Sequence, residues 1–240
     1  MALETVILQK SLPHAIATEE ATLSSALVTI FRGKFCNTIL PGRTPIQFKS
    51  GEVIYNIGDL DRSMFFIQKG FVKVGTLVPD GREIIYDVRK AGDVVGELCV
   101  AKTPRPDRAV ALEPSEAIHV SYSEIISTLG KYPDLLFKLI EIFCNCLADA
   151  YDQITSLTVH NLHGRVVQVL LDLAAKLSSA NGDPVQIPAY LTQEEISQMV
   201  GARRERVSTT LNSLRRRGLV DYSSRGHLLL QTAALRGLVS

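Results

Sequence analysis

Two short helical runs near the end of the chain constrain its fold more than any other feature. Residues 192–200 carry an apolar helical face, residues 203–217 hold six arginines, and only Gly201-Ala202 separates the two runs. An apolar helix, a glycine turn and a basic second helix are typical of a helix-turn-helix, whose second helix enters the DNA major groove. The pattern therefore predicts a DNA-binding domain.

The composition indicates a folded protein with a localised basic region. Hydrophobic residues make up 46% and charged residues 21% of the 240 positions, as in a globular chain with one large or two small domains. The net charge is only +1, yet residues 159–240 hold ten Lys and Arg against six Asp and Glu. We therefore expect a polyanion such as DNA to bind this part of the chain.

Several functional classes lack support in the sequence. No apolar run is long enough to span a bilayer, and the first residues lack the order of a signal peptide, so we expect a cytoplasmic protein. Its cysteines then stay reduced, and their spacing does not suggest a zinc site. They are Cys36, Cys99, Cys144 and Cys146. We find no Ser-His-Asp set, phosphate loop or paired catalytic carboxylates, so we expect neither a metal nor an enzyme.

The middle of the chain has the sequence pattern of an all-β domain. Beyond Pro45, short runs rich in β-branched and aromatic residues alternate with glycine-containing turns. The expected strands are residues 53–55, 64–67, 71–74, 83–88, 109–112 and 117–122. Their regular spacing predicts a barrel or sandwich. Short helices are expected before it, one of them over residues 22–31.

After Pro133 the apolar period becomes helical. Residues recur by four and three over more than three heptads, which is the spacing of a coiled-coil seam. They are Leu136, Ile140, Phe143, Leu147, Ala150, Ile154, Leu157 and Asn161. The alternative is that the seam packs on the chain's own β domain. The length of the helix favours self-association, so we expect a homodimer, with Asn161 at a helix terminus or hinge.

The helix-turn-helix has identifiable parts. Thr192 and Glu195 form a capping box at its start, and a hairpin of residues 219–220 and 228–230 makes the motif winged. Side chains near the start of the second helix are expected to reach base edges. The expected DNA-binding residues are Thr192, Arg203, Arg204, Glu205, Arg206, Ser208, Thr209 and Arg215. Within the second helix Arg206, Arg215, Arg216 and Arg217 are expected on phosphates or in solvent.

The order of these parts resembles the Crp/Fnr family of bacterial transcription factors, named after the cyclic-AMP receptor protein and the fumarate-nitrate regulator. The resemblance covers nearly the whole chain from Pro45. It rests on GDVVGEL at 92–98, LEPSE at 112–116, LTQEEI at 191–196 and GLV at 218–220. It implies an α+β fold: N-terminal helices and a β-roll (jelly roll) of the cyclic-nucleotide-binding type (1–134), a dimerisation helix (135–160) and a winged helix-turn-helix (161–240). It also implies a palindromic operator and contact with RNA polymerase.

The resemblance assigns operator contacts. Arg204 and Glu205 match an Arg-Glu pair that commonly opens the family's recognition helix. The family's usual second arginine, four residues after that glutamate, is Thr209 here, and Arg206 replaces a small residue. The resemblance thus implies an operator that differs from the common family palindrome.

The resemblance also implies an effector site. In nucleotide-binding members a Gly-Glu pair starts a phosphate-binding helix, and Gly96, Glu97 and Leu98 match this start. Arg105 matches the arginine that neutralises the cyclic phosphate.

Several neighbouring residues depart from that site. Pro106 has no amide N–H to donate, and Asp107 repels an anion. Ala150 and Tyr151 stand where the family has the Thr-Ser pair that contacts adenine. We therefore expect an effector other than cyclic AMP, or none, and no cofactor.

Two alternatives stay open. One is a regulator that does respond to cyclic AMP. The other is a ligand- or redox-sensing module that acts through protein contacts with weakened DNA binding, which Thr209 favours. The cysteine cluster of the family's iron–sulfur branch is missing, since only Cys36 lies near the N-terminus. Cys99 and His119 are conceivable haem ligands, but isolated residues of this kind are usually structural.

Overall fold

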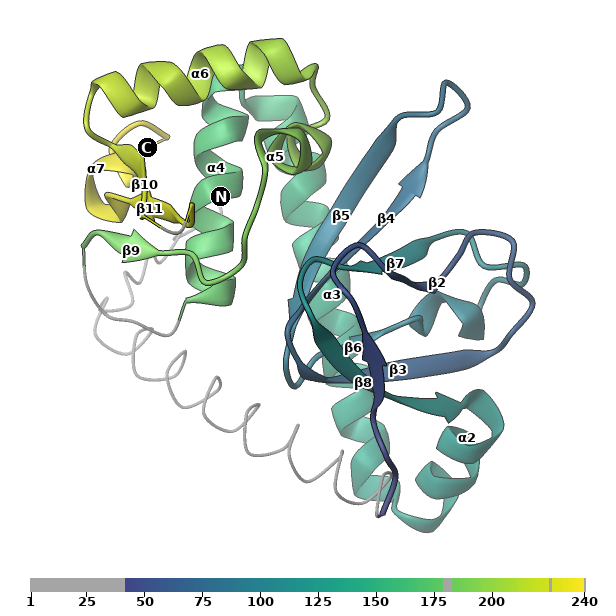
Figure 1. Cartoon of the computed structure of the whole chain (residues 1–240). Coiled ribbons are helices and arrows are strands. Elements are labelled where there is room, and N and C mark those ends of the chain that lie inside the picture. The colour runs from purple at the N-terminus through teal and green to yellow at the C-terminus, as the bar shows by residue number, and fades with distance from the viewer. Residues whose placement is uncertain (1–41, 179–182, 225, 240) are drawn as a thin grey trace, which may run out of the picture.

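The computed structural model describes residues 42–178, 183–224 and 226–239. The helices expected near the N-terminus and Cys36 lie outside the described residues, as do positions 181 and 182 of an expected turn. The chain folds into a β domain and a C-terminal α+β domain, with the long helix α3 (Pro133–Val159) between them (Figure 1).

Two antiparallel sheets form the β domain and enclose an apolar core. The strands are β1 (Ile46–Phe48), β2 (Val53–Tyr55), β3 (Ser63–Lys69), β4 (Phe71–Leu77), β5 (Glu83–Lys90), β6 (Val94–Val95), β7 (Arg108–Ala111) and β8 (Ser115–Ser121). Their orders are β1-β8-β3-β6 and β2-β7-β4-β5. Tyr55, Phe65, Ile67 and Val72 belong to the core between them. A short 3-10 helix, η1 (Glu97–Val100), follows β6.

The last expected strand ends one residue early. Tyr122 starts the helix α2 (Tyr122–Lys131) instead of continuing β8. The reason is a second capping box: the Ser121 hydroxyl accepts from the Glu124 amide, and the Glu124 carboxylate accepts from the Ser121 amide. This box turns the chain from strand into helix.

The C-terminal domain combines four helices and a small sheet. They are α4 (Leu162–Leu177), α5 (Gln193–Val200), α6 (Arg204–Arg216) and α7 (Thr232–Arg236), with β9 (Val185–Gln186), β10 (Val220–Tyr222) and β11 (Leu228–Leu230). The sheet order is β10-β11-β9. Asn161 marks the boundary between α3 and α4, where its side chain accepts a 3.0 Å hydrogen bond from the Gly164 amide. The predicted helix terminus at Asn161 is confirmed.

The apolar core of the C-terminal domain extends to the β-roll. Leu170, Ile196 and Leu211 are completely buried inside the C-terminal domain. Val88 of β5 belongs to the same cluster, and Phe71 packs at its edge. The hairpin of β4 and β5 therefore packs against the helix-turn-helix, as Figure 1 shows beside α5. The α+β fold class expected from the sequence is confirmed.

Candidate nucleic-acid interface and sensor cluster

The helix-turn-helix consists of α5, a tight turn and α6. Gly201 ends α5 in the left-handed conformation at φ 67°, which favours glycine because it has no Cβ. Val207, Leu211 and Leu214 are fully buried and hold α6 against the domain. Figure 1 shows α6 along the outer edge of the C-terminal domain, away from the β-roll.

The predicted capping box at the start of α5 is present. The Thr192 hydroxyl accepts a 3.2 Å hydrogen bond from the Glu195 amide, and the Glu195 carboxylate accepts a 2.8 Å bond from the Thr192 amide. Glu195 also lies 3.8 Å from the ammonium of Lys73 on β4. One carboxylate thus caps α5 and faces the β-roll.

Thr192→Ala tests this cap. We expect the free energy of unfolding to fall by about 1 kcal/mol, because the Glu195 amide loses the Thr192 hydroxyl as its acceptor. Chemical denaturation of the whole protein measures the loss. Thr210→Ala inside α6 is the matched control and should leave stability nearly unchanged; equal losses for both variants would contradict a capping role.

The outward face of α6 carries the predicted DNA contacts. Helical periodicity places Glu205, Thr209, Asn212 and Arg216 opposite the buried side chains, and all four are exposed. The other predicted contacts are Arg203, Arg204, Arg206 and Arg215, which are also exposed, and Ser208, which is half-buried. Thr192 is exposed at the start of α5. The structure thus brings all the predicted residues to α6 and the adjoining start of α5.

Arg204 and Thr209 have partners on the helix-turn-helix itself. The Arg204 guanidinium lies 4.0 Å from the Glu194 carboxylate, and both groups are largely exposed. The Thr209 hydroxyl donates to the Glu205 carbonyl at 2.9 Å. An exposed pair such as Arg204 with Glu194 contributes little to stability, so Arg204 can exchange this partner for a base at low cost.

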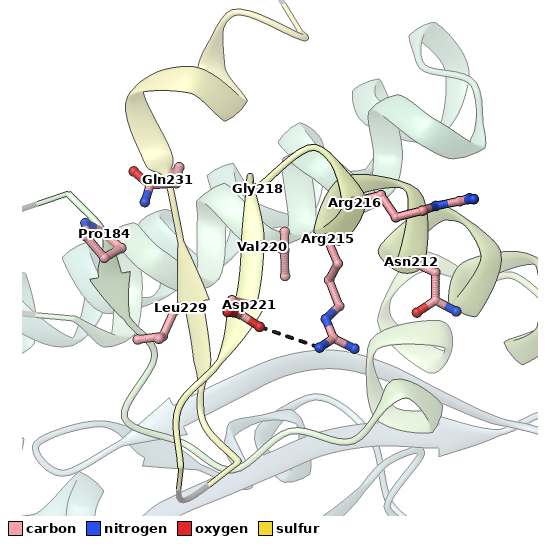
Figure 2. Close-up of a pocket in the computed structure, with 9 residues that line it drawn as sticks. All are labelled: Pro184, Asn212, Arg215, Arg216, Gly218, Val220, Asp221, Leu229 and Gln231. Carbon is pink, nitrogen blue, oxygen red and sulfur yellow. Dashed lines mark ion pairs between the residues drawn. The ribbon is translucent and has the colours of Figure 1, made fainter.

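A cavity of about 620 Å³ lies between the second half of α6 and the wing strands β10 and β11. Figure 2 shows Asn212, Arg215 and Arg216 on its helical side and Asp221 on its wing side. Arg215 is held there by Asp221 at 3.5 Å, with its guanidinium 5.2 Å from the ring centre of Tyr222. Sequence reasoning did not select Asn212, although its spacing of seven residues from Glu205 places it on the same face.

An apolar stripe of α3 is left open. Ile140, Leu147 and Ile154 keep 47%, 50% and 57% of their surface exposed. Helical periodicity places Cys144 and Tyr151, both exposed, between them on the same face. This stripe of Ile140, Cys144, Leu147, Tyr151 and Ile154 has the alternating spacing of a coiled-coil seam.

The coiled-coil seam predicted from the sequence was wrong at Phe143. This side chain is half-buried and packs with Leu139 against a β-roll cluster that includes Phe66. The reason is that α3 has two apolar faces, one against the β-roll and one in the open. Repeats of three and four residues do not separate the two faces.

A cluster of charged side chains lies where β5, η1 and α3 meet. The Arg89 guanidinium forms ion pairs with Asp87 at 2.8 Å and Glu97 at 3.6 Å, and it donates to the Cys146 sulfur at 3.4 Å. We call Asp87, Arg89 and Glu97 the sensor cluster. Burial raises the pKa of Glu97, although Arg89 opposes this effect. Burial alone would lower the pKa of Arg89, but the two carboxylates outweigh it and hold it above its ordinary value.

Sequence reasoning missed Arg89. The available signal was the alternation along β5, in which Asp87 and Arg89 lie on one face of a strand whose neighbour Val88 is buried. Two charged residues on one face of a strand with a buried neighbour indicate polar contacts between that strand and the elements packed on it.

Arg105 is a fully buried part of the β-roll rather than an open anion site. Its Nη1 donates to the Gly96 carbonyl at 3.2 Å and its Nη2 to the Ser63 carbonyl at 2.5 Å. Its guanidinium lies 4.3 Å from the ring centre of Tyr55. Gly96 has φ 89°, and a Cβ there would lie 2.9 Å from Arg105 Nη1, so glycine is required by both conformation and space.

Asp107 completes the polar interior beside Arg105. It is 1% exposed, and its Oδ2 accepts a 2.8 Å hydrogen bond from the Tyr55 hydroxyl. Burial raises its pKa, and the hydrogen bond from Tyr55 opposes the rise. Ala150 and Tyr151, by contrast, are exposed on α3. The structure therefore brings Gly96, Arg105 and Asp107 together, but leaves Ala150 and Tyr151 exposed, with Tyr151 on the open stripe.

The sensor cluster continues into the C-terminal domain. The Lys176 ammonium of α4 donates to Asp87 at 2.6 Å and to Asp149 of α3 at 3.3 Å. The Lys90 ammonium of β5 donates to the Lys176 carbonyl at 2.5 Å. A row of alternating charges thus joins Glu97 to α4.

Two findings bear on other kinds of site. Among residues 42–178, 183–224 and 226–239, no three potential metal-ligating side chains come together. Within the same part of the chain, every helix is too short or too polar to cross a lipid bilayer.

Comparison with known proteins assigns both domains. Residues 45–132 match the family model of the cyclic nucleotide-binding domain, and residues 164–238 match that of the Crp-like helix-turn-helix domain. The chain belongs to the Crp/Fnr family of transcription regulators. This family assignment makes it a DNA-binding transcription regulator, and members of the family are not enzymes.

Relatives of this Crp/Fnr regulator align over most of its length. It is 28% identical to the CRP-like cAMP-activated global transcriptional regulator of Mycobacterium tuberculosis, covering 80% of this chain and 86% of the relative. It is 26% identical to the fumarate and nitrate reduction regulatory protein of Vibrio cholerae, covering 83% and 79%. The two relatives are described by different functions, so the family assignment alone does not choose an effector.

Solved structures share the fold. FixK2 from Bradyrhizobium japonicum superposes with a TM-score of 0.71 at 22% identity, covering 82% of this chain and 97% of FixK2. A CRP-family transcriptional regulator from Thermus thermophilus superposes with a TM-score of 0.67 at 26% identity, covering 81% and 96%.

Proposed function

We propose that this Crp/Fnr regulator binds a palindromic operator as a homodimer and reads its sequence with α6. The observation that carries the proposal is the outward face of α6, with an Arg-Glu pair at its start and further arginines at its end. Two copies related by two-fold symmetry would present their recognition helices about 34 Å apart, one turn of DNA. RNA polymerase is the expected protein partner on the promoter, by family membership alone.

The open stripe of α3 supports the dimer. A contiguous apolar face on a helix of this length is unfavourable in water and indicates a protein contact. Its repeat is that of a two-stranded coiled coil, in which each residue of the stripe meets the same residue of the second copy near the axis. The dimer would bury Leu147 and Ile154.

The proposed roles of the α6 side chains follow from their chemistry. Arg204 can form a bidentate pair with guanine, and Glu205 can accept from cytosine N4. Arg216 and Arg217 lie at the end of the helix, where they would meet phosphates and add affinity without sequence preference. A gel-shift series on the upstream region of the protein's own gene tests this function: salt-sensitive binding with sequence preference supports it. Absence of both would favour a protein-interaction module with weakened DNA binding.

We propose further that the β-roll does not use cyclic AMP. The Gly96 and Ser63 carbonyls occupy both terminal nitrogens of Arg105, which a bidentate contact with a cyclic phosphate would need. Pro106 has no amide to donate, and the Asp107 carboxylate would lie beside the anion. The residues present therefore do not fit a cyclic nucleotide.

Calorimetric titration of cyclic AMP tests this proposal. We expect no saturable heat at ligand concentrations up to about 1 mM, which would place any binding weaker than about −4 kcal/mol. Saturable binding with micromolar affinity would overturn the proposal. The double variant with Pro106→Ser and Asp107→Ala provides a comparison. We expect that it also fails to bind cyclic AMP, because Arg105 keeps its carbonyl partners.

The sensor cluster offers a route by which another signal would reach the DNA-binding domain. Asp87 contacts both Arg89 and Lys176. A ligand that separated Arg89 from Asp87 would therefore alter the ion pair between Asp87 and Lys176 of α4. Such a ligand would act by its different affinities for two arrangements of the domains. Without a ligand, the amount of protein would set its activity.

A further inference from the structure

We propose that Asn212 is a specificity-determining residue, whose side-chain amide recognises an adenine in the operator. The inference rests on the proposed role of α6 in reading bases. It adds a base contact in the second half of the helix, beyond the residues matched to the family pattern.

The position of Asn212 aligns it with the expected base-reading residues. It lies seven residues after Glu205 and three after Thr209, on the face opposite the buried Val207 and Leu214. At 1.5 Å per residue, Asn212 stands roughly 10 Å further along the axis than Glu205, which equals about three base-pair steps of 3.4 Å. A helix lying in the groove would bring the two side chains to different base pairs.

The chemistry of this face favours bases over phosphates. Glu205 would repel a phosphate, and Thr209 is short and uses its hydroxyl proton on its own helix. Asn212 carries no charge, and its amide has no hydrogen-bond partner in the part of the chain that the structure describes. An asparagine amide presents one donor and one acceptor side by side, which matches N7 and N6 of adenine.

The surroundings supply the cations that a DNA strand needs at this point. Arg215 and Arg216 flank Asn212 along the cavity between α6 and the wing (Figure 2). Arg215 is anchored by Asp221, whereas Arg216 extends freely from the exposed end of the helix. Arginines that hold the backbone fix the register of α6, and Asn212 between them would then face a base edge.

Replacing single adenines by 7-deazaadenine tests the contact in the whole protein. This base pairs normally but lacks the N7 acceptor. Using an operator selected from random DNA, fluorescence anisotropy would measure the affinity for each replacement in one half-site. We expect one position to weaken wild-type binding roughly fivefold to tenfold, since a good bidentate contact discriminates at least this strongly. Asn212→Ala should bind the same modified and unmodified operators equally.

Ser213→Ala is the matched control, because Ser213 is the next residue but lies off this face. It should keep the wild-type sensitivity to 7-deazaadenine. If Asn212→Ala weakens binding to operator and random DNA alike, or stays sensitive at every adenine, the inference is overturned. The inference is also overturned if no adenine replacement weakens the wild-type protein more than it weakens Asn212→Ala. Loss of all sequence preference in the wild-type protein would instead contradict the proposed function itself.

Discussion

Leu147→Glu is expected to convert the protein into a monomer and to lower operator affinity roughly 100-fold or more. Leu147 lies at the centre of the open stripe of α3, where the second copy would place the same residue. Two carboxylates facing each other in a dry seam lose hydration and repel one another. A monomer would lose the affinity that a dimer gains by binding both half-sites at once, which reaches factors of 10² to 10⁴.

Light scattering would measure the oligomeric state and fluorescence anisotropy the affinity. Asn145→Glu is the matched control: it adds the same charge two residues away, on the exposed polar side of α3. It should remain a dimer with unchanged affinity. A dimeric Leu147→Glu variant that binds normally would show that another surface joins the two copies.

Arg204→Ala is expected to lower the affinity for the operator by about 1–3 kcal/mol while hardly changing the affinity for random DNA. The reason is that a bidentate pair with guanine exists only at the correct base. Its present partner, Glu194, is exposed and contributes little, so the folded structure should not change. Anisotropy titrations on the two kinds of DNA measure the difference.

Arg216→Ala provides the contrast. A phosphate contact is made on every sequence, so operator and random DNA should weaken by similar factors, and the salt dependence should decrease by about one ion. Equal losses on both kinds of DNA for Arg204→Ala as well would contradict the assignment of base contacts to the start of α6.

Local patterns predicted much of the fold because local chemistry decides it. The short strand at Val53–Tyr55, the capping box at Thr192 and the end of α5 at Gly201 all depend on neighbouring residues. The outward face of α6 was predictable for the same reason. Its three buried residues fix which side of the helix remains open.

Contacts between distant segments could not be predicted in this way. Phe143 was placed in the exposed seam, although it packs on the β-roll, because one helix can be apolar on two sides. The sensor cluster was missed because Asp87 meets Lys176, which is 89 residues away. Arg105 was assigned to the effector site by resemblance alone, and only the structure shows that its guanidinium donates to the Gly96 and Ser63 carbonyls. The division of the chain into residues 1–134, 135–160 and 161–240 stays a prediction.

Selection of binding sites from random double-stranded DNA tests the role of α6 most directly. The wild-type protein should enrich an inverted repeat whose half-sites are centred about 10 base pairs apart. Arg204→Ala should lose the preference at one symmetric pair of positions and keep it elsewhere. Recovery of unrelated sequences by the wild-type protein, or the same repeat without change by Arg204→Ala, would contradict sequence reading by α6.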